Sequence, residues 1–202
     1  MIANRIRMRK KSKGDTWDGI FADPEVGRVL KANGLIADAN KSSIEELSQI
    51  TTLNTGSKYY NNIFYKNTRI TKFPELQYCT GLTNLQYAFN GCSKLTEVII
   101  PDSVTRLDYT FEGCSSLNKY PVIPASVTDM LYTFKDCIAA SGYIIILATT
   151  LPRVRRFHYN DSRNPFDGAS VSRIYVPDEL VSRYKSGWIY TSIIYPISSL
   201  PK

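Results

Sequence analysis

The chain repeats itself at a fixed interval, and this repetition limits its fold more than any other feature. Three nine-residue segments share the pattern Gly/Ser-Leu/Val-Thr-x-Leu/Met-x-Tyr-Ala/Thr-Phe, namely residues 81–89, 103–111 and 126–134. Degenerate copies surround Phe64 and Phe166. A unit of about 22–23 residues is too short to bury an apolar face by itself, so neighbouring units must bury one another. We therefore expect an α+β repeat solenoid that spans residues 56–177.

Each position of the repeat should become a column along the stack, with the strand spacing of about 4.8 Å between rungs. The expected core columns are Phe89, Phe111 and Phe134, and, three residues after each Phe, Cys92, Cys114 and Cys137. A cysteine in such a column behaves as a small apolar residue. Neighbouring rungs would bring thiols close enough for a disulfide, so both states stay open, and we expect free thiols.

A third column, two residues before each Phe, carries the clearest functional signal, and its members are Tyr87, Tyr109 and Tyr132. A row of tyrosines on an outer face offers flat apolar rings with polar tips, which suits a glycan or a protein partner. The alternative is that the rings only cover the edge of the repeat and shield the Phe residues. The sequence leaves both interpretations open.

These repeats resemble a known family. The run Ala88-Phe-x-Gly-Cys-Ser-x-Leu-Thr-x-Val-x-Ile-Pro-x-Ser-Val-Thr105 is similar to the BspA-type leucine-rich repeat, found in gut anaerobes and their phages. Residues 21–26 and 164–188 are similar to the opening and closing segments of such proteins. The resemblance implies a non-catalytic protein used in surface display, in adhesion or as a structural part of a virion.

A solenoid needs a cap at each end. Residues 20–55 predict a helix–loop–helix cap, with Asp23 and Pro24 opening one helix and a Ser43-x-x-Glu46 capping box opening another. In related proteins this loop resembles an EF-hand, but alanines and a lysine occupy residues 37–42 here. We therefore expect a degenerate loop without metal. Residues 178–202 predict a C-terminal helical cap, in which Asp178 begins a short helix.

The charge is concentrated in the first residues. The chain has a formal net charge of +7, and residues 1–13 hold six basic residues and no acid. Apolar and basic residues alternate there, as in a strand that pairs with a partner's edge. We interpret residues 1–19 as a docking tail for a protein partner, against the alternative of a frayed terminus. Its candidate contacts are Arg5, Ile6, Arg7, Met8, Arg9, Lys10 and Lys11.

A second basic patch holds Arg153, Arg155, Arg156 and Arg163. A solvated face is the simpler interpretation of this patch, and a site for phosphate or for an acidic partner is the other. The rest of the chain is nearly neutral, so we do not expect a nucleic-acid-binding body.

Signals for catalysis are missing from the sequence. His158 is the single histidine, and no phosphate-binding glycine loop or Cys-x₂-Cys pair accompanies it. We expect no enzyme, cofactor or metal. The longest uncharged stretch, residues 138–152, is too short for a membrane span, which needs about 20 apolar residues.

The predicted function is a structural or adhesion protein. Since no apolar signal region follows the basic run, we expect a phage virion component, such as a head or tail appendage or a decoration protein, anchored by its tail. The alternative is a bacterial cell-surface adhesin that binds host protein or glycan and lies outside the cell. A binder of nucleic acid or anionic surfaces is a third, weaker option. Multi-copy assembly is open.

Overall fold

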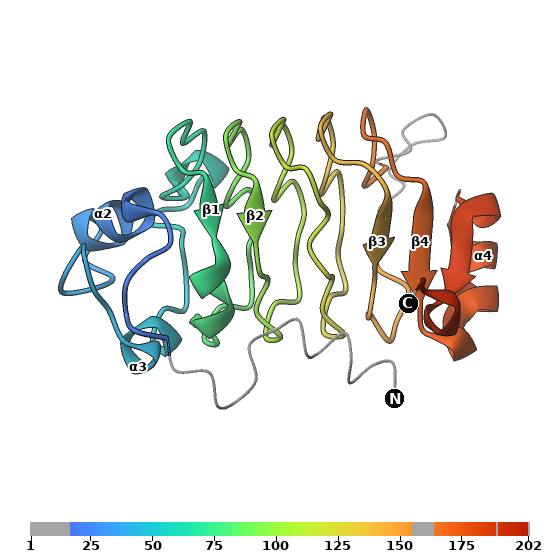
Figure 1. Ribbon diagram of the computed structural model, residues 1–202, viewed down its shortest axis with the longest axis horizontal. Helices are drawn as coiled ribbons and strands as arrows, with labels where there is room; N and C mark the ends of the chain where they lie inside the picture. Colours follow the sequence, from blue (N-terminus) through green and yellow to red (C-terminus); the bar gives the residue numbers. More distant parts are fainter. Residues whose placement is uncertain (1–16, 155–163, 189, 202) are drawn as a thin grey trace.

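The computed structural model describes residues 17–154, 164–188 and 190–201. The chain forms a row of turns that lie side by side along the long axis of the molecule, with helices at both ends of the row (Figure 1). The helices are α2 (Pro24–Ala32), α3 (Ile44–Ser48) and α4 (Val181–Gly187). The strands are β1 (Lys72–Phe73), β2 (Glu97–Val98), β3 (Tyr143–Ile145), β4 (Arg173–Val176) and β5 (Ile194–Pro196). Short 3₁₀ turns cover η1 (Tyr59–Asn61), η2 (Pro74–Tyr78), η3 (Asp178–Leu180), η4 (Thr191–Ile193) and η5 (Ile197–Ser199).

Successive turns are joined by parallel pairing in two ladders. The first ladder contains two groups of parallel strands. In one group β1 pairs with β2, and in the other β4 pairs with both β3 and β5. The other ladder consists of single bridges that run through Asn84, Arg106, Asp129 and Arg153. Parallel rungs at equivalent repeat positions stack in chain order, as the repeat fold predicts.

The centre of the row is a column of stacked phenylalanine rings, which we call the Phe column: Phe64, Phe89, Phe111, Phe134 and Phe166. Neighbouring ring centroids lie 5.5–5.8 Å apart. The rings of Phe89 and Phe111 are inclined by only 3°. All five side chains are buried. Stacked rings in a dry core add to the hydrophobic stabilisation of burial.

The cysteines connect one repeat to the previous one. All four are free and buried. The Sγ atoms of Cys92, Cys114 and Cys137 donate, at 3.0–3.2 Å, to the carbonyl oxygens of the Phe residues one repeat earlier, which are Phe64, Phe89 and Phe111 respectively. The thiols therefore point across the stack toward backbone carbonyls.

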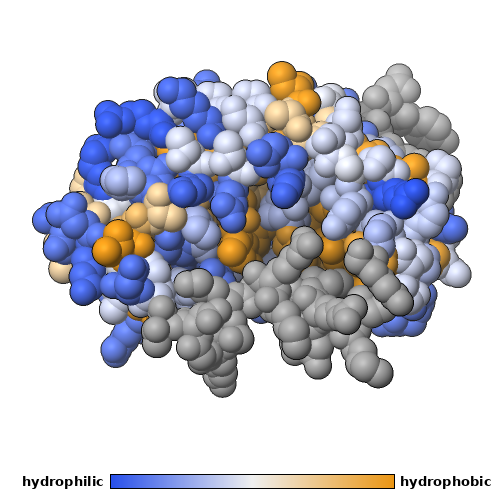
Figure 2. All heavy atoms as spheres, in the orientation of Figure 1, coloured by the Kyte–Doolittle hydropathy of each residue, from blue (hydrophilic) through white to orange (hydrophobic). Residues whose placement is uncertain are grey.

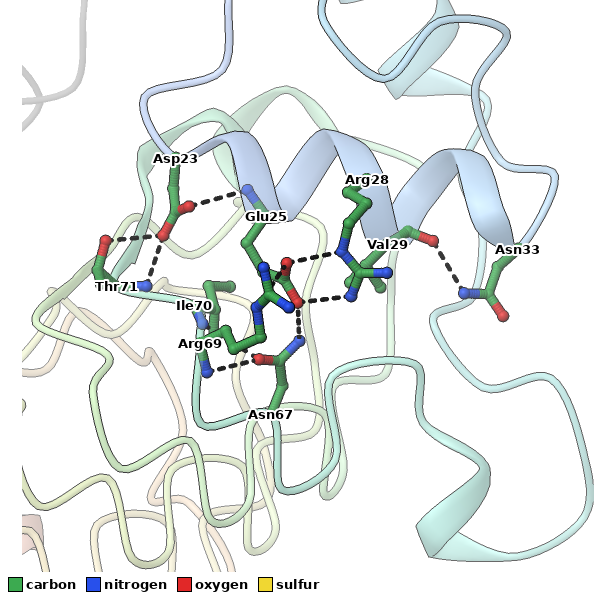
Figure 3. Close-up of polar contacts among 9 residues, drawn as sticks. All are labelled: Asp23, Glu25, Arg28, Val29, Asn33, Asn67, Arg69, Ile70 and Thr71. Carbon is green, nitrogen blue, oxygen red and sulfur yellow. Dashed lines mark hydrogen bonds and ion pairs between the residues drawn. The ribbon is translucent and has the colours of Figure 1, made fainter.

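The first helix begins as the sequence predicts. The Asp23 side chain accepts from the backbone N–H of Glu25, Pro24 occupies the first turn, and Gly34 follows the helix with φ of +70°. Figure 3 shows how this end is tied to the first repeat, because Asp23 also accepts from both the N–H and the hydroxyl of Thr71. Burial opposes ionisation of Asp23, but these hydrogen bonds outweigh it and lower its pKa.

Glu25 forms a second tie at the same end. Arg28 donates two hydrogen bonds of 2.7 Å to its carboxylate, and Asn67 of the first repeat donates a third. The guanidinium of Arg28 lowers the pKa of Glu25 to about 2. Arg69 lies 3.4 Å away and adds to the effect.

Three local expectations were wrong in detail. Ser43 does accept from the N–H of Glu46, but the Glu46 carboxylate binds Ala37 and Ser42 instead of closing a reciprocal box. The 3₁₀ turn η3 begins at Asp178 and α4 follows from Val181, but the Asp178 carboxylate accepts from the N–H of Ser198 and caps neither element. Pro101 is predicted to end its strand, since proline cannot donate to a ladder, but β2 ends at Val98, three residues earlier.

The far end of the row is closed by apolar side chains. Trp188, Ile194 and Ile197 are buried there, and Tyr184 donates a hydrogen bond to the carbonyl of Ala148. Among the described residues, no helix has the length and apolar character needed to cross a membrane.

Candidate functional site

A second stack of aromatic rings accompanies the Phe column, and we call it the Tyr column: Tyr59, Tyr87, Tyr109 and Tyr132. The rings of Tyr87 and Tyr109 lie 4.6 Å apart and only 6° from parallel. Tyr59 continues the stack at 4.7 Å, and Tyr132 closes it at 5.5 Å. The predicted tyrosines therefore meet in one surface.

Tyr59 was missed by the sequence analysis. It lies in η1, five residues before Phe64, whereas the repeat position two residues before that Phe is held by Asn62. Because Tyr59 is out of phase with the repeat, periodicity alone could not place it. The neighbouring run of Tyr59 and Tyr60 was the available signal.

The tyrosines of the repeats adopt an uncommon backbone conformation. Tyr87, Tyr109 and Tyr132 have φ of +59°, +58° and +46°. Bulky L-residues rarely occupy this left-handed region, and each instance costs about 1–3 kcal/mol. The turn holds them there, since the Tyr87 N–H donates to Asp108 of the next repeat and its carbonyl accepts from Asn90.

The exposure of the column suits contact with a partner. The three repeat tyrosines are half-buried, and Tyr59 is 49% exposed. Burial, together with the neighbouring Tyr109, raises the pKa of Tyr87 to about 12. The Tyr87 hydroxyl thus stays a neutral donor and acceptor at physiological pH.

A charged pair lies at the far end of the column. Lys135 Nζ lies 5.3 Å from the ring centroid of Tyr132 and 2.9 Å from a carboxylate oxygen of Glu112. Hydrogen bonding to Glu112 raises the pKa of Lys135. The ammonium is therefore fixed over an aromatic face, a favourable cation–π arrangement.

An uncharged pocket of about 320 Å³ adjoins the other end of the column. It is lined by Thr51, Thr52, Asn54, Ser57, Tyr59, Asn62, Asn84, Gln86 and Tyr87. Asn62 uses both amide hydrogens on the backbone oxygens of Tyr59 and Gln86. This wall is therefore fixed, and hydroxyl and amide groups face a pair of stacked rings. Such a surface can form neutral hydrogen bonds and ring contacts.

The predicted basic sites are not assembled by the described part of the structure. Arg153 is exposed and lies in the bridge ladder opposite Asp129, where its N–H donates to Thr128. Outside the described residues lie Arg155, Arg156 and Arg163, together with His158 and the tail candidates Arg5, Ile6, Arg7, Met8, Arg9, Lys10 and Lys11.

Metal ligation and thiol reactivity can be checked directly among the described residues. They contain no cluster of three or more His, Cys, Asp or Glu side chains that could hold a metal ion. Burial raises the pKa of both Cys92 and Cys137 to about 12. A thiol that stays protonated is a poor nucleophile, so the cysteines serve packing.

Comparison with known protein families matches residues 42–141 to the BspA type leucine-rich repeat region, in six copies. Over these residues the chain belongs to the BspA-type leucine-rich repeat family. Repeats of this family are generally non-catalytic and indicate a role in protein binding or adhesion. A search of curated proteins finds no match to this chain.

Proposed function

We propose that the protein is a non-catalytic adhesion module whose Tyr column contacts a protein partner. In this proposal residues 56–177 form a solenoid, residues 20–55 and 178–202 cap it, and residues 1–19 dock it to a carrier. The observation that carries the proposal is the Tyr column itself, with its tyrosines at left-handed backbone positions in three consecutive repeats.

The choice of residue at this turn supports a binding role. Glycine is the residue that a left-handed position ordinarily selects, and it is present at the second left-handed position of the same turn, in Gly91 and Gly113. At the first position the chain keeps tyrosine in spite of the strain. Tyrosine is enriched among residues that dominate binding energy, so the ring explains the choice better than the backbone does.

The test compares tyrosines on and off the column. Binding to immobilised extracellular-matrix glycoproteins is measured for Tyr87→Ala and Tyr109→Ala, with Tyr143→Ala and Tyr195→Ala as matched controls, since both control tyrosines are exposed and outside the column. Each column variant should weaken binding about tenfold or more, the usual effect of removing a binding hot spot. Equal binding by column and control variants would remove the proposal.

A neutral glycan is the second candidate, because the 320 Å³ pocket carries hydroxyl and amide groups beside two tyrosine rings and no charged side chain. A glycan array separates the two candidates. The pocket would be assigned to carbohydrate if glycan binding disappears in Asn84→Ala and Gln86→Ala while both variants still bind the deglycosylated protein.

A place in a phage particle stays a prediction, as does the alternative of a bacterial surface. The predicted anchor is the basic tail, and its test is deletion of residues 1–13. The truncated chain should fold but no longer enter the particle. Normal incorporation of the truncated chain would exclude anchoring by the tail.

A further inference from the structure

Three buried carboxylates join residues 17–33, which we call the α2 segment, to the first repeat. Two of them, Asp23 and Glu25, belong to the α2 segment and accept hydrogen bonds from the repeat (Figure 3). The third is Glu75 of η2, and its Oε1 accepts from the backbone N–H of Ala22 at 2.9 Å. The junction is therefore held by acids from both sides.

Glu75 is the least satisfied of the three acids. It is only 5% exposed, and its Oε2 is buried without a hydrogen-bond partner in the part of the chain that the structure describes. Elsewhere this end of the molecule, at the left of Figure 2, shows mainly hydrophilic side chains at its surface. A carboxyl group that is removed from water without gaining partners is strongly disfavoured in its ionised form.

The charges that act on Glu75 leave this burial uncompensated. Lys72 of β1 favours the ionised form of Glu75, but Glu97 of β2 opposes it. The Cys79 thiol follows η2 and stays protonated, because burial raises its pKa to about 12. Burial is the largest influence on Glu75, and it raises the pKa of this carboxyl above its ordinary value.

The other elements packed against η2 also bring charged groups to this end of the molecule. Besides Asp23 and Glu25, the charged side chains of the α2 segment and of α3 are either exposed or already hydrogen-bonded: Asp18, Arg28, Lys31, Glu45 and Glu46. The buried oxygen of Glu75 therefore depends on its own protonation for relief.

We propose that Glu75 is a pH-sensitive latch between the α2 segment and the first repeat. As a neutral acid it stays buried and holds Ala22 through its Oε1. As a carboxylate it turns toward water, because the buried position leaves its Oε2 without solvation. Ala22 is then released, while Asp23 and Glu25 keep the α2 segment attached.

The direction of the pH dependence follows from the pKa shifts. The pKa of Glu75 is raised, so its contribution is complete below the ordinary glutamate pKa of about 4.3 and is lost as the pH rises through the folded value. The pKa values of Asp23 and Glu25 are lowered, so their contributions are lost only as the pH falls below about 4. Of the three acids, Glu75 is therefore the one expected to change state between about pH 5 and about pH 8.

The ionisation of Glu75 is measured by carbon-13 NMR of the side-chain carboxyl groups. Its titration midpoint should lie above that of Glu97, which is an exposed acid on the neighbouring strand β2 and serves as the control. Equal midpoints for the two acids would overturn the proposal.

The release of Ala22 is measured by amide hydrogen exchange, expressed as protection relative to an unstructured peptide so that the intrinsic effect of pH cancels. Ala22 protection should fall about threefold or more from about pH 5 to about pH 8. It should stay constant in Glu75→Gln, which keeps the accepting oxygen and cannot ionise. The control Glu97→Gln removes the same charge from β2 and should behave as the unmodified chain. A pH-independent Ala22 in the unmodified chain, or an equal fall in Glu75→Gln, would refute the latch.

A second amide distinguishes a local latch from a general loss of stability. Leu107 is buried in the middle of the row, and its N–H donates to the carbonyl of Asp129. Its protection should stay unchanged over the same pH range. If Leu107 and Ala22 lose protection together, the whole fold responds to pH and the latch is contradicted.

Discussion

The Phe column and the Tyr column are two stacks built from the same repeat, only two residues apart, yet their environments differ. Phe89, Phe111 and Phe134 have no exposed surface and stack at 5.5–5.8 Å. The three repeat tyrosines, Tyr87, Tyr109 and Tyr132, are half-buried and have a left-handed backbone conformation. The same repeat therefore places the Phe column in the core and the Tyr column at the surface. Substitutions should separate stability from binding along this line.

The largest effect is expected in the Phe column. Phe111→Ala removes a ring stacked on both sides and leaves a cavity, so the free energy of unfolding should fall by about 3–5 kcal/mol. Chemical denaturation monitored by circular dichroism measures the loss. A loss below about 1 kcal/mol would mean that the column is not the core.

The second effect concerns the turn that both columns share. Gly113 has φ of +72°, and a Cβ atom added there would meet no atom closer than 3.7 Å. Gly113→Ala should therefore destabilise the fold by about 1 kcal/mol through backbone strain alone. Lys66 holds the equivalent position with φ of +54°. The reciprocal change Lys66→Gly should stabilise the fold by up to about 1 kcal/mol, and the same sign for both variants would contradict this explanation.

A smaller effect is expected in the Tyr column. Tyr109→Gly relieves left-handed strain of about 1–3 kcal/mol. It also loses two ring contacts, with Tyr87 and Tyr132, of about 0.5–1.5 kcal/mol each, so the two changes largely offset one another. Denaturation should show a net change under about 1 kcal/mol, while partner binding falls about tenfold. If the free energy of unfolding falls as much as in Phe111→Ala, the tyrosines serve the fold. That result would favour the alternative in which their rings only cover the edge of the repeat and shield the Phe residues.

The smallest effect is a dependence on alkaline pH. The pKa of Tyr87 is raised to about 12 in the folded chain, against about 10 for a free tyrosine. Between these values the unfolded phenol ionises while the folded one does not, so stability is complete below pH 10 and falls from pH 10 to 12. Stability measured across this range should decline less steeply in Tyr87→Phe. An unchanged slope would contradict the raised pKa.

The sequence predicts the repeat and its Phe and Cys positions well, because a 22–23-residue period fixes which side chains share a column. It could not predict the left-handed tyrosines, since the usual rule assigns such positions to glycine. The sequence also did not indicate that the Asp178 side chain caps no helix and accepts instead from the N–H of Ser198, twenty residues away.

The most direct test of the shared register is the spacing of rings in solution. NMR on protein with selectively labelled phenylalanine and tyrosine should give through-space contacts from Phe89 to Phe111 and from Phe111 to Phe134. It should give equally strong contacts between Tyr87 and Tyr109, whose rings lie 4.6 Å apart. Contacts within the Phe set but none among the tyrosines would contradict the claim that one repeat builds both columns.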